Sequence, residues 1–393
     1  MVEVSNKFMW KLQEDILEDK DKKILVDFIN STNRFTQFEK VKEHEQSWSN
    51  WQGINFSTYV NSGSSADLIM LDAVKELYHI PDSAEVLVPA ITWTTNITSV
   101  AQARLKPVFV DVNLVDLSFD YDQLEKHITE RTKIIFVTHL IGLPANMDRL
   151  QQLADKHNLI ILEDCCESHG ATFNGRKVGN FGLASTFSFY WGHHITTVEG
   201  GMVCTNNEEL HDLLVLKRSH GLARELVPEK FKRYQEENPG IDPNFLFVTQ
   251  GYNVRNTELH AVLGIEQLKH LDRYIKIRND NHKRYLEIIG VIKDRLYPID
   301  NAGISSFCLP FIFKDSADKV KFKSALMAQD IESRPVISGN LLRQPCFLQF
   351  GDFKNFPNAD IVHQNGLYIG NNQFVNKERL ELLKGIIRQT LGA

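Results

Sequence analysis

The chain has 393 residues, of which 42% are apolar and 24% are charged, a composition typical of globular proteins and too apolar for a disordered chain. At about 150 residues per domain, this length predicts two or three domains. The 44 Lys and Arg residues against 50 Asp and Glu residues give a net charge of −6. No basic run occurs that could neutralise a phosphate backbone, so nucleic acid is excluded as an expected partner.

The N-terminal residues and the cysteines give no sign of export or of a metal. Charged residues interrupt the apolar positions of residues 1–14, unlike a signal peptide, and no stretch approaches the ~18 apolar residues needed to cross a membrane. The five cysteines are odd in number and none has C-x-x-C spacing, which argues against a disulfide framework or a zinc site. We therefore expect a cytoplasmic protein without membrane contact and without a bound metal.

The first ~55 residues are patterned as polar helices with one apolar face. From about Asn61, short apolar runs alternate with helix-length segments. These runs lie at residues 86–89, 107–112, 133–138, 159–164, 185–190 and 201–205. Strands that are apolar on both faces and joined by helices predict an α/β domain with a mainly parallel sheet.

The second half is expected to begin with a polar surface excursion at residues 223–243. Apolar residues at helical spacing follow at 258–271, and a further helix is expected to about residue 291. Strand and helix patterns then restart at 307–313, 318–329 and 331–337. We predict a large domain at residues 1–285, which includes the N-terminal helical segment, and a smaller C-terminal α+β domain at 286–393.

Three segments carry the chemical signal. In residues 61–70, small residues run directly into a helical pattern, and the free backbone N–H groups of such a helix start can bind phosphate, although Ser is also an ordinary N-cap. The strand at 159–164 ends in acids, and strand ends line the ligand crevice of an open α/β sheet, so Asp164 and Glu167 are candidates for ligand contact or for helix capping. His193 and His194 follow the strand expected at 185–190; taken alone, such a pair is more often structural than catalytic.

In their order and separations, these segments resemble the DegT/DnrJ/EryC1/StrS family of sugar-nucleotide aminotransferases, which are pyridoxal 5'-phosphate (PLP) enzymes of the aspartate aminotransferase fold, also called the type I PLP fold. The resemblance covers nearly the whole chain and rests on residues 62–65, 89–96, 139–148, 163–171, 251–255 and 264–268. It implies that fold, a PLP-binding large domain, and a homodimer with shared active sites.

The resemblance also implies roles for individual residues. Asp164 would keep the pyridine nitrogen protonated, Trp93 would stack on the ring, and Glu167, at a position that is usually Gln, would contact the ring hydroxyl. The matches to phosphate-binding positions are Ser64, Ser65, Ser188 and, reaching across from a second subunit, Asn253. Candidate anion binders for glutamate or for the substrate diphosphate are Arg218, His220, Arg255 and Arg334. Salt bridging, or core packing for His220, is the alternative for these four residues.

One position departs from most of the family. Where the family has the lysine that forms a Schiff base with PLP, this sequence has His193, and no lysine lies between Lys177 and Lys217. Imidazole cannot form a stable imine, so the cofactor should be held without a covalent bond. Imidazole can still transfer protons near neutral pH.

The same replacement is typical of the sugar 3-dehydratase branch, which this chain also resembles at residues 331–340. By that resemblance, L-glutamate converts PLP to pyridoxamine phosphate (PMP), which condenses with a nucleotide-linked 4-keto-6-deoxy sugar, and His193 takes a proton from the cofactor's C4′ so that the C3 hydroxyl leaves. Hydrolysis then releases ammonia and a 4-keto-3,6-dideoxy sugar. GDP-4-keto-6-deoxymannose is the favoured substrate on the resemblance alone, because no residue pattern distinguishes the nucleotide.

Three alternatives remain at the level of sequence. An iron–sulfur dehydratase needs closely spaced cysteines, and residues 220–251 contain none, so we expect no iron–sulfur cluster. An aminotransferase that forms an amino sugar would retain the nitrogen on its product, but it would lack the usual nucleophile. A non-catalytic protein with the cofactor fold would have no reason to keep Asp164, Trp93 and the phosphate-site serines together.

Overall fold

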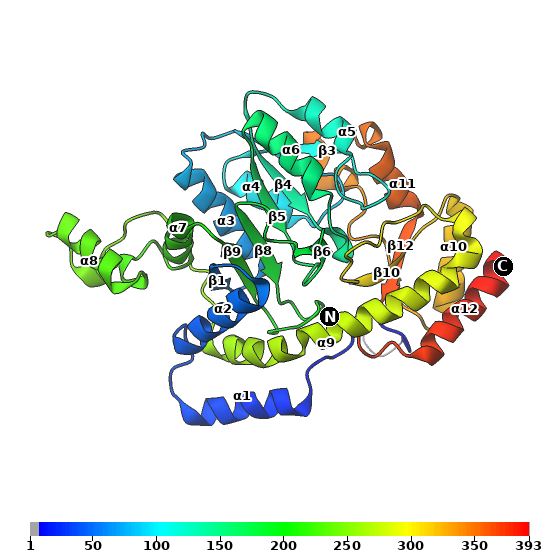
Figure 1. Cartoon of the computed structure of the whole chain (residues 1–393), viewed down its shortest axis with the longest axis horizontal. Helices are drawn as coiled ribbons and strands as arrows, with labels where there is room; N and C mark the ends of the chain where they lie inside the picture. The colour runs from blue at the N-terminus through cyan, green and yellow to red at the C-terminus, as the bar shows by residue number, and fades with distance from the viewer. Residues whose placement is uncertain (1–7, 393) are drawn as a thin grey trace.

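A seven-stranded sheet forms the centre of the computed structural model, which describes residues 8–392 (Figure 1). The strands lie in the order β1-β9-β8-β5-β4-β2-β3, and β9 alone among them runs opposite to the others. Their bounds are β1 Phe56–Val60, β2 Glu85–Pro89, β3 Lys106–Val110, β4 Thr132–Thr138, β5 Ile160–Asp164, β8 Ala184–Ser188 and β9 Gly201–Thr205. The predicted mainly parallel α/β sheet is therefore confirmed.

Helices bury both faces of this sheet, as its apolar strands require. On one face Ile134 and Phe136 of β4 share a core with α3 (Gly63–Leu77), α4 (Thr95–Gln102) and α7 (Glu208–Arg218). On the other face Ile135 and Val137 pack with α6 (Met147–His157), and α5 (Tyr121–Leu124) contributes Leu124. Farther along that second face, α2 (Glu39–Gln52) and α9 (Glu258–Ile289) cover β1, β8 and β9.

The N-terminal segment is only partly helical, contrary to the sequence pattern. Residues 1–7 lie outside the described structure, residues 8–18 form no helix, and α1 begins later, spanning Asp19–Ser31. The segment instead lies against the C-terminal part, where Trp10 pairs with Ile331 and its Nε1 donates to the Gly370 carbonyl at 3.0 Å. Its buried apolar residues thus pack against a distant part of the chain and do not form the apolar face of a helix.

The C-terminal part contains a second, antiparallel sheet in the order β10-β12-β11. Its strands are β10 Cys308–Ile312, β11 Ser333–Arg334 and β12 Gly366–Gly370, with helices α10 Ser316–Ala328, α11 Pro357–Asn365 and α12 Lys377–Leu391. Figure 1 shows α9 running from beneath the large sheet to this small one. It is one helix of 32 residues. Two helices were predicted there, but the span has no proline to end the first. The division at 285/286 falls inside α9 and stays a prediction.

The polar excursion carries a helix that the sequence pattern did not predict. Helix α8 (Pro228–Glu237) starts with proline at its first position, buries none of its residues, and projects away from the sheet (Figure 1). A short hairpin, β6 (Thr172–Phe173) and β7 (Arg176–Lys177), follows β5. Within residues 8–392, no helix is both long and apolar enough to span a membrane.

His44 of α2 is a buried histidine whose protonation affects the stability of the fold. Its ring centroid lies 4.7 Å from that of Tyr59 and 5.4 Å from that of Phe189, and a Cβ on Gly264 would come within 2.6 Å of the ring. Both ring nitrogens are buried without a hydrogen-bond partner among the described residues. This burial lowers the pKa of His44 to about 3, so protonation favours the unfolded chain.

We predict that His44 makes stability fall as the pH decreases from about 6.5, its value in an unfolded chain, towards 3, with full stability above that range. His44→Leu should reduce the slope of unfolding free energy against pH by up to about 1.4 kcal/mol per pH unit. Urea unfolding at several pH values measures this slope, with His157→Leu on α6 as the control. An unchanged slope in His44→Leu would contradict this role of His44.

Candidate active site

Asp164 is the last residue of β5, where the carboxyl ends of the parallel strands meet. The residue is only 4% exposed. Oδ2 accepts a hydrogen bond from Asn96 Nδ2 at 3.0 Å, and Oδ1 accepts one from the Cys166 backbone N–H at 2.9 Å. Two donors thus orient a buried carboxylate at the edge of the sheet, the arrangement needed to pair with a protonated ring nitrogen.

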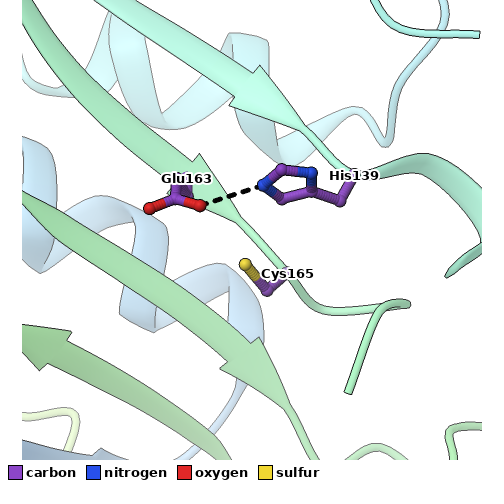
Figure 2. Close-up of side chains that lie close together, drawn as sticks. All are labelled: His139, Glu163 and Cys165. Atoms are coloured by element: carbon purple, nitrogen blue, oxygen red, sulfur yellow. Dashed lines mark hydrogen bonds and ion pairs between the residues drawn. The ribbon is translucent and has the colours of Figure 1, made fainter. Parts of the chain in front are cut away.

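The neighbouring Glu163 points to the opposite face, as strand alternation requires. Figure 2 shows it beside His139 and Cys165. His139 Nε2 donates to Glu163 Oε2 at 3.0 Å. The carboxylate also accepts from the backbone N–H groups of Gly179, Phe181 and Gly182, at 2.7, 2.7 and 2.6 Å. His139 Nδ1 accepts from the Ala145 N–H at 3.0 Å.

The cluster of His139, Glu163 and Cys165 is therefore an anchor rather than a metal site, because both imidazole nitrogens and both carboxylate oxygens already have partners. Burial disfavours the charge of Glu163, but the hydrogen bond and charge of His139 and the N–H groups of the loop hold the pKa of Glu163 below its usual value. The anchor fixes the end of β5, and hence the position of Asp164.

The start of α3 lies against the end of β8. Ser62 caps the helix, its Oγ accepting from the Ser65 N–H at 3.1 Å. A Cβ on Gly63 would lie 2.8 Å from Ser188 Cβ and 3.1 Å from Ser188 Oγ, so the approach leaves no room for a side chain. The structure thus brings Ser65 and Ser188 to a helix N-terminus, which suits a phosphate group. Ser64, between Gly63 and Ser65 in the same first turn of α3, is exposed.

Glu167 and Trp93 lie in the loops that follow β5 and β2. Glu167 Oε2 accepts from the Ile141 N–H at 2.9 Å. Burial, with a smaller contribution from the charge of Asp164 and against the Ile141 hydrogen bond, raises the pKa of Glu167 to about 8. The carboxyl group is therefore largely protonated at neutral pH and can donate a hydrogen bond, as an amide would. Trp93 is 55% exposed, so its ring is free to stack on a ligand.

The two adjacent histidines have different surroundings. His194 is fully buried, and its Nε2 lies 3.1 Å from Ser305 Oγ. His193 is half-buried, with its ring centroid 5.6 Å from that of Phe307, and its Nδ1 has no partner among the described residues. Burial, followed by the charge of Arg278, lowers the pKa of His193 to about 3, so its ring stays neutral and one nitrogen keeps a lone pair. His193 is thus the better placed of the two to accept a proton.

The predicted anion binders are not gathered into one cluster. Arg218 is 5% exposed and already paired, with Nη1 lying 2.5 Å from Glu45 Oε1 and donating to the Tyr59 carbonyl at 2.9 Å. This contact favours salt bridging, the alternative noted for Arg218. Arg334 is exposed and lies 3.4 Å from Glu332.

Of the other two candidates, Arg255 lies beside β1, whereas the His220 N–H donates to the Tyr252 carbonyl at 2.7 Å. Arg255 pairs with Val60 in an isolated bridge, and its Nε donates to the exposed Asn253 Oδ1 at 3.1 Å. His220 is exposed and has a φ of 63°, in the left-handed region. The binding roles of all these residues remain predictions.

Two residues of the site were not singled out from the sequence. Asn96 orients Asp164, and it ends the motif at 89–96. Asp67 of α3 is 1% exposed and accepts from Thr186 Oγ1 at 2.7 Å and Thr95 Oγ1 at 3.2 Å. Burial, and next the charge of Asp164, raise the pKa of Asp67 well above its usual value. An acid at an apolar position of a helical pattern was the signal that could have revealed it.

Comparison with known proteins identifies the family to which the chain belongs. The chain belongs to the DegT/DnrJ/EryC1/StrS aminotransferase family, whose model matches residues 16–384. The family resemblance and the aspartate aminotransferase fold inferred from the sequence are both confirmed.

The individual relatives are more specific. The chain is 34% identical over 365 residues to a GDP-4-keto-6-deoxy-D-mannose 3-dehydratase of Escherichia coli O55:H7, covering 90% of this chain and 93% of that protein. Two solved structures, one of the E. coli enzyme with bound hydrated PLP and one of such a dehydratase with a trapped PLP–glutamate geminal diamine, each match with a TM-score of 0.88 and 32% identity. Each match covers 96% of this chain and 99% of the other.

The residues present fit PLP. The cradle at Gly63 and Ser188 suits the phosphate, the doubly hydrogen-bonded Asp164 suits the ring nitrogen, and the half-buried His193 retains an unpartnered ring nitrogen. The anchor of His139, Glu163 and Cys165 does not occupy this site, because Glu163 points to the opposite face of the sheet from Asp164.

We predict that Gly63→Ala weakens PLP binding by about tenfold or more, because an added Cβ must push Ser188 away from the helix start at a cost of ~1–3 kcal/mol. Spectrophotometric titration of the apoprotein with PLP measures the dissociation constant. Gly385→Ala in α12 is the matched control, since its Cβ would meet nothing within 4 Å and PLP affinity should not change. Equal affinities in the two variants would refute the cradle.

Proposed function

We propose that the protein is a PLP- and PMP-dependent 3-dehydratase, which converts a nucleotide-linked 4-keto-6-deoxy sugar to the 4-keto-3,6-dideoxy sugar with release of ammonia. GDP-4-keto-6-deoxymannose is the proposed substrate. The observation that carries this proposal is the neutral imidazole of His193, in the loop after β8 where most of the family has a lysine.

The lysines that flank this loop in the sequence are engaged elsewhere. Lys217 is 2% exposed, and its Nζ lies 2.6 Å from Asp72 Oδ2 and 2.8 Å from Glu76 Oε2. Lys177 Nζ lies 3.7 Å from the centre of the Trp51 ring. Neither amine is free to take the place of a Schiff-base lysine, which supports a cofactor held by hydrogen bonds and packing alone.

When bound, the cofactor supplies an amine that condenses with the sugar ketone and a ring that accepts electrons. Asp164 would hold a proton on the ring nitrogen, and the start of α3 with Ser188 would hold the phosphate. Glu167, protonated at neutral pH, can donate a hydrogen bond to the ring oxygen. His193 would accept and return the proton that elimination of the C3 hydroxyl requires.

The same replacement explains why an aminated sugar is not the proposed product. In an aminotransferase, the lysine amine displaces the product amine from the cofactor. Imidazole cannot do this, so the product leaves by reaction with water and its nitrogen leaves as ammonia. L-Glutamate is the proposed amino donor, in line with the PLP–glutamate adduct in one similar dehydratase.

We predict that His193→Asn lowers dehydration of GDP-4-keto-6-deoxymannose by about 10²–10⁴-fold, because it removes the proton acceptor. The assay contains protein, PLP, glutamate and this substrate, and mass spectrometry follows a sugar nucleotide lighter by one oxygen atom. His157→Asn on α6 should keep full activity. A His193→Asn variant that binds PLP and still dehydrates at the normal rate would overturn the proposal, as would an aminated product from the unmodified chain.

The proposed homodimer is supported by exposed apolar residues on the excursion that carries α8 and on the residues directly after it. These are Val227 and Ile241 of the excursion, at 53% and 49%, and Phe245 and Phe247 just beyond it, at 63% and 56%. Such a group on a projecting segment is typical of an interface. A second copy of this chain is the proposed partner.

A cytoplasmic location is also proposed, because none of the five cysteines forms a disulfide.

We predict that the double substitution Phe245→Ser with Phe247→Ser shifts the mass in sedimentation from two chains towards one, because it removes apolar area from the interface. The control pair, Val320→Ser with Met327→Ser on α10, is equally exposed at 63% and 64% and should remain dimeric. Dissociation in both pairs, or in neither, would contradict the assignment of this surface.

A further inference from the structure

A group of possible metal ligands lies where α1 packs against α9, away from the active site. A carboxylate oxygen of Asp21, one of Glu266 and a ring nitrogen of His270 lie within 4.8 Å of one another. Glu266 and His270 are one turn apart on α9, and Glu266 Oε1 lies 3.7 Å from His270 Nε2. Asp21 comes from α1, so the group joins two helices that are far apart in the sequence.

Two buried oxygen atoms, one in this group and one on Gln267 beside Asp21, lack a partner among the described residues. Asp21 is 1% exposed; its Oδ2 accepts from the Glu18 N–H at 2.8 Å and from Gln267 Nε2 at 3.0 Å, whereas Oδ1 accepts nothing. Gln267 is fully buried and its Oε1 is also unpartnered. Because an unsatisfied buried oxygen costs about 1–3 kcal/mol, two of them on side chains that are hydrogen-bonded to each other point to a missing positive partner.

A cation already occupies the mouth of the group. Lys20 Nζ lies 2.6 Å from His270 Nε2 and 3.7 Å from Glu266 Oε1. The Lys20 side chain is 45% exposed, so its stem can swing into solvent and leave both ligand atoms free. The ammonium thus marks the place that a metal ion would take, and it would compete with that ion.

We propose that Asp21, Glu266 and His270 form a binding site for a divalent transition-metal ion of the Zn²⁺ type. An imidazole with two carboxylates suits such an ion, whereas Mg²⁺ and Ca²⁺ prefer oxygen ligands alone. Tetrahedral Zn²⁺ needs ligand atoms ~3.3 Å apart, close to the separation of Glu266 Oε1 and His270 Nε2. A rotation of the Asp21 carboxylate would complete the set with its free Oδ1, and water would fill the fourth position.

The site would connect α1 to the long helix α9. Helix α1 buries little of its own surface, since Asp21 is its one fully buried residue. A bound ion would therefore stabilise the docking of α1 in proportion to its concentration and affinity. The reaction uses none of these residues, so this inference stands or falls independently of the proposed function.

Calorimetric titration of the full chain with PLP bound tests the site, using Zn²⁺ as the probe. We expect one Zn²⁺ per chain at this site. His270→Ala should weaken binding by about 100-fold or more, since loss of even an outer partner of a metal ligand costs 10–100-fold. His157→Ala is the control and should leave binding unchanged.

Lys20→Met gives a test that misfolding cannot mimic, because it removes the competing ammonium and should raise Zn²⁺ affinity by about tenfold. Its control is Lys22→Met, which removes an exposed lysine of the same helix. Zn²⁺ should also slow amide exchange in α1 of the unmodified chain. The proposal is overturned if the unmodified chain binds no Zn²⁺, if His270→Ala binds as tightly, or if Lys20→Met binds no more tightly.

Discussion

The buried carboxylate of Glu163 is the interaction on which the active-site geometry depends. It ties the end of β5 to His139 after β4 and to the loop at residues 179–182, through hydrogen bonds from an imidazole and three backbone N–H groups. A charge taken out of water is stable only when it is fully hydrogen-bonded in this way. Strand alternation then leaves Asp164, the next residue, facing the opposite side with its own two donors.

The type of reaction is set by a single side chain, His193, in a site that otherwise resembles that of an aminotransferase. The phosphate cradle and the oriented carboxylate suit PLP whether or not a lysine is present. With His193 instead of lysine, the site keeps a proton acceptor but has no amine to displace a product. The same cofactor chemistry then ends in elimination and release by water, which is why the proposed reaction is dehydration.

Much of this could be predicted from the sequence because it is encoded locally. Apolar runs gave six strands of the large sheet, and the small residues at 61–70 indicated the start of α3. The features that the sequence did not predict come from contacts between residues that are far apart in the chain. Asn96 meets Asp164 across 68 positions, Trp10 meets Gly370 across 360, and Asp21 meets Gln267 across 246. No local period in the sequence encodes such pairs.

The fate of the amino nitrogen tests the central claim most directly. Glutamate labelled with ¹⁵N would be supplied to the protein with PLP and GDP-4-keto-6-deoxymannose, and the label followed in ammonia and in the sugar nucleotide. With His193 in place of lysine, we predict that the label appears as free ammonia, in equal amount to a deoxygenated sugar that contains none. Label retained on the sugar would contradict the account, because it would show that product leaves this site as an amine.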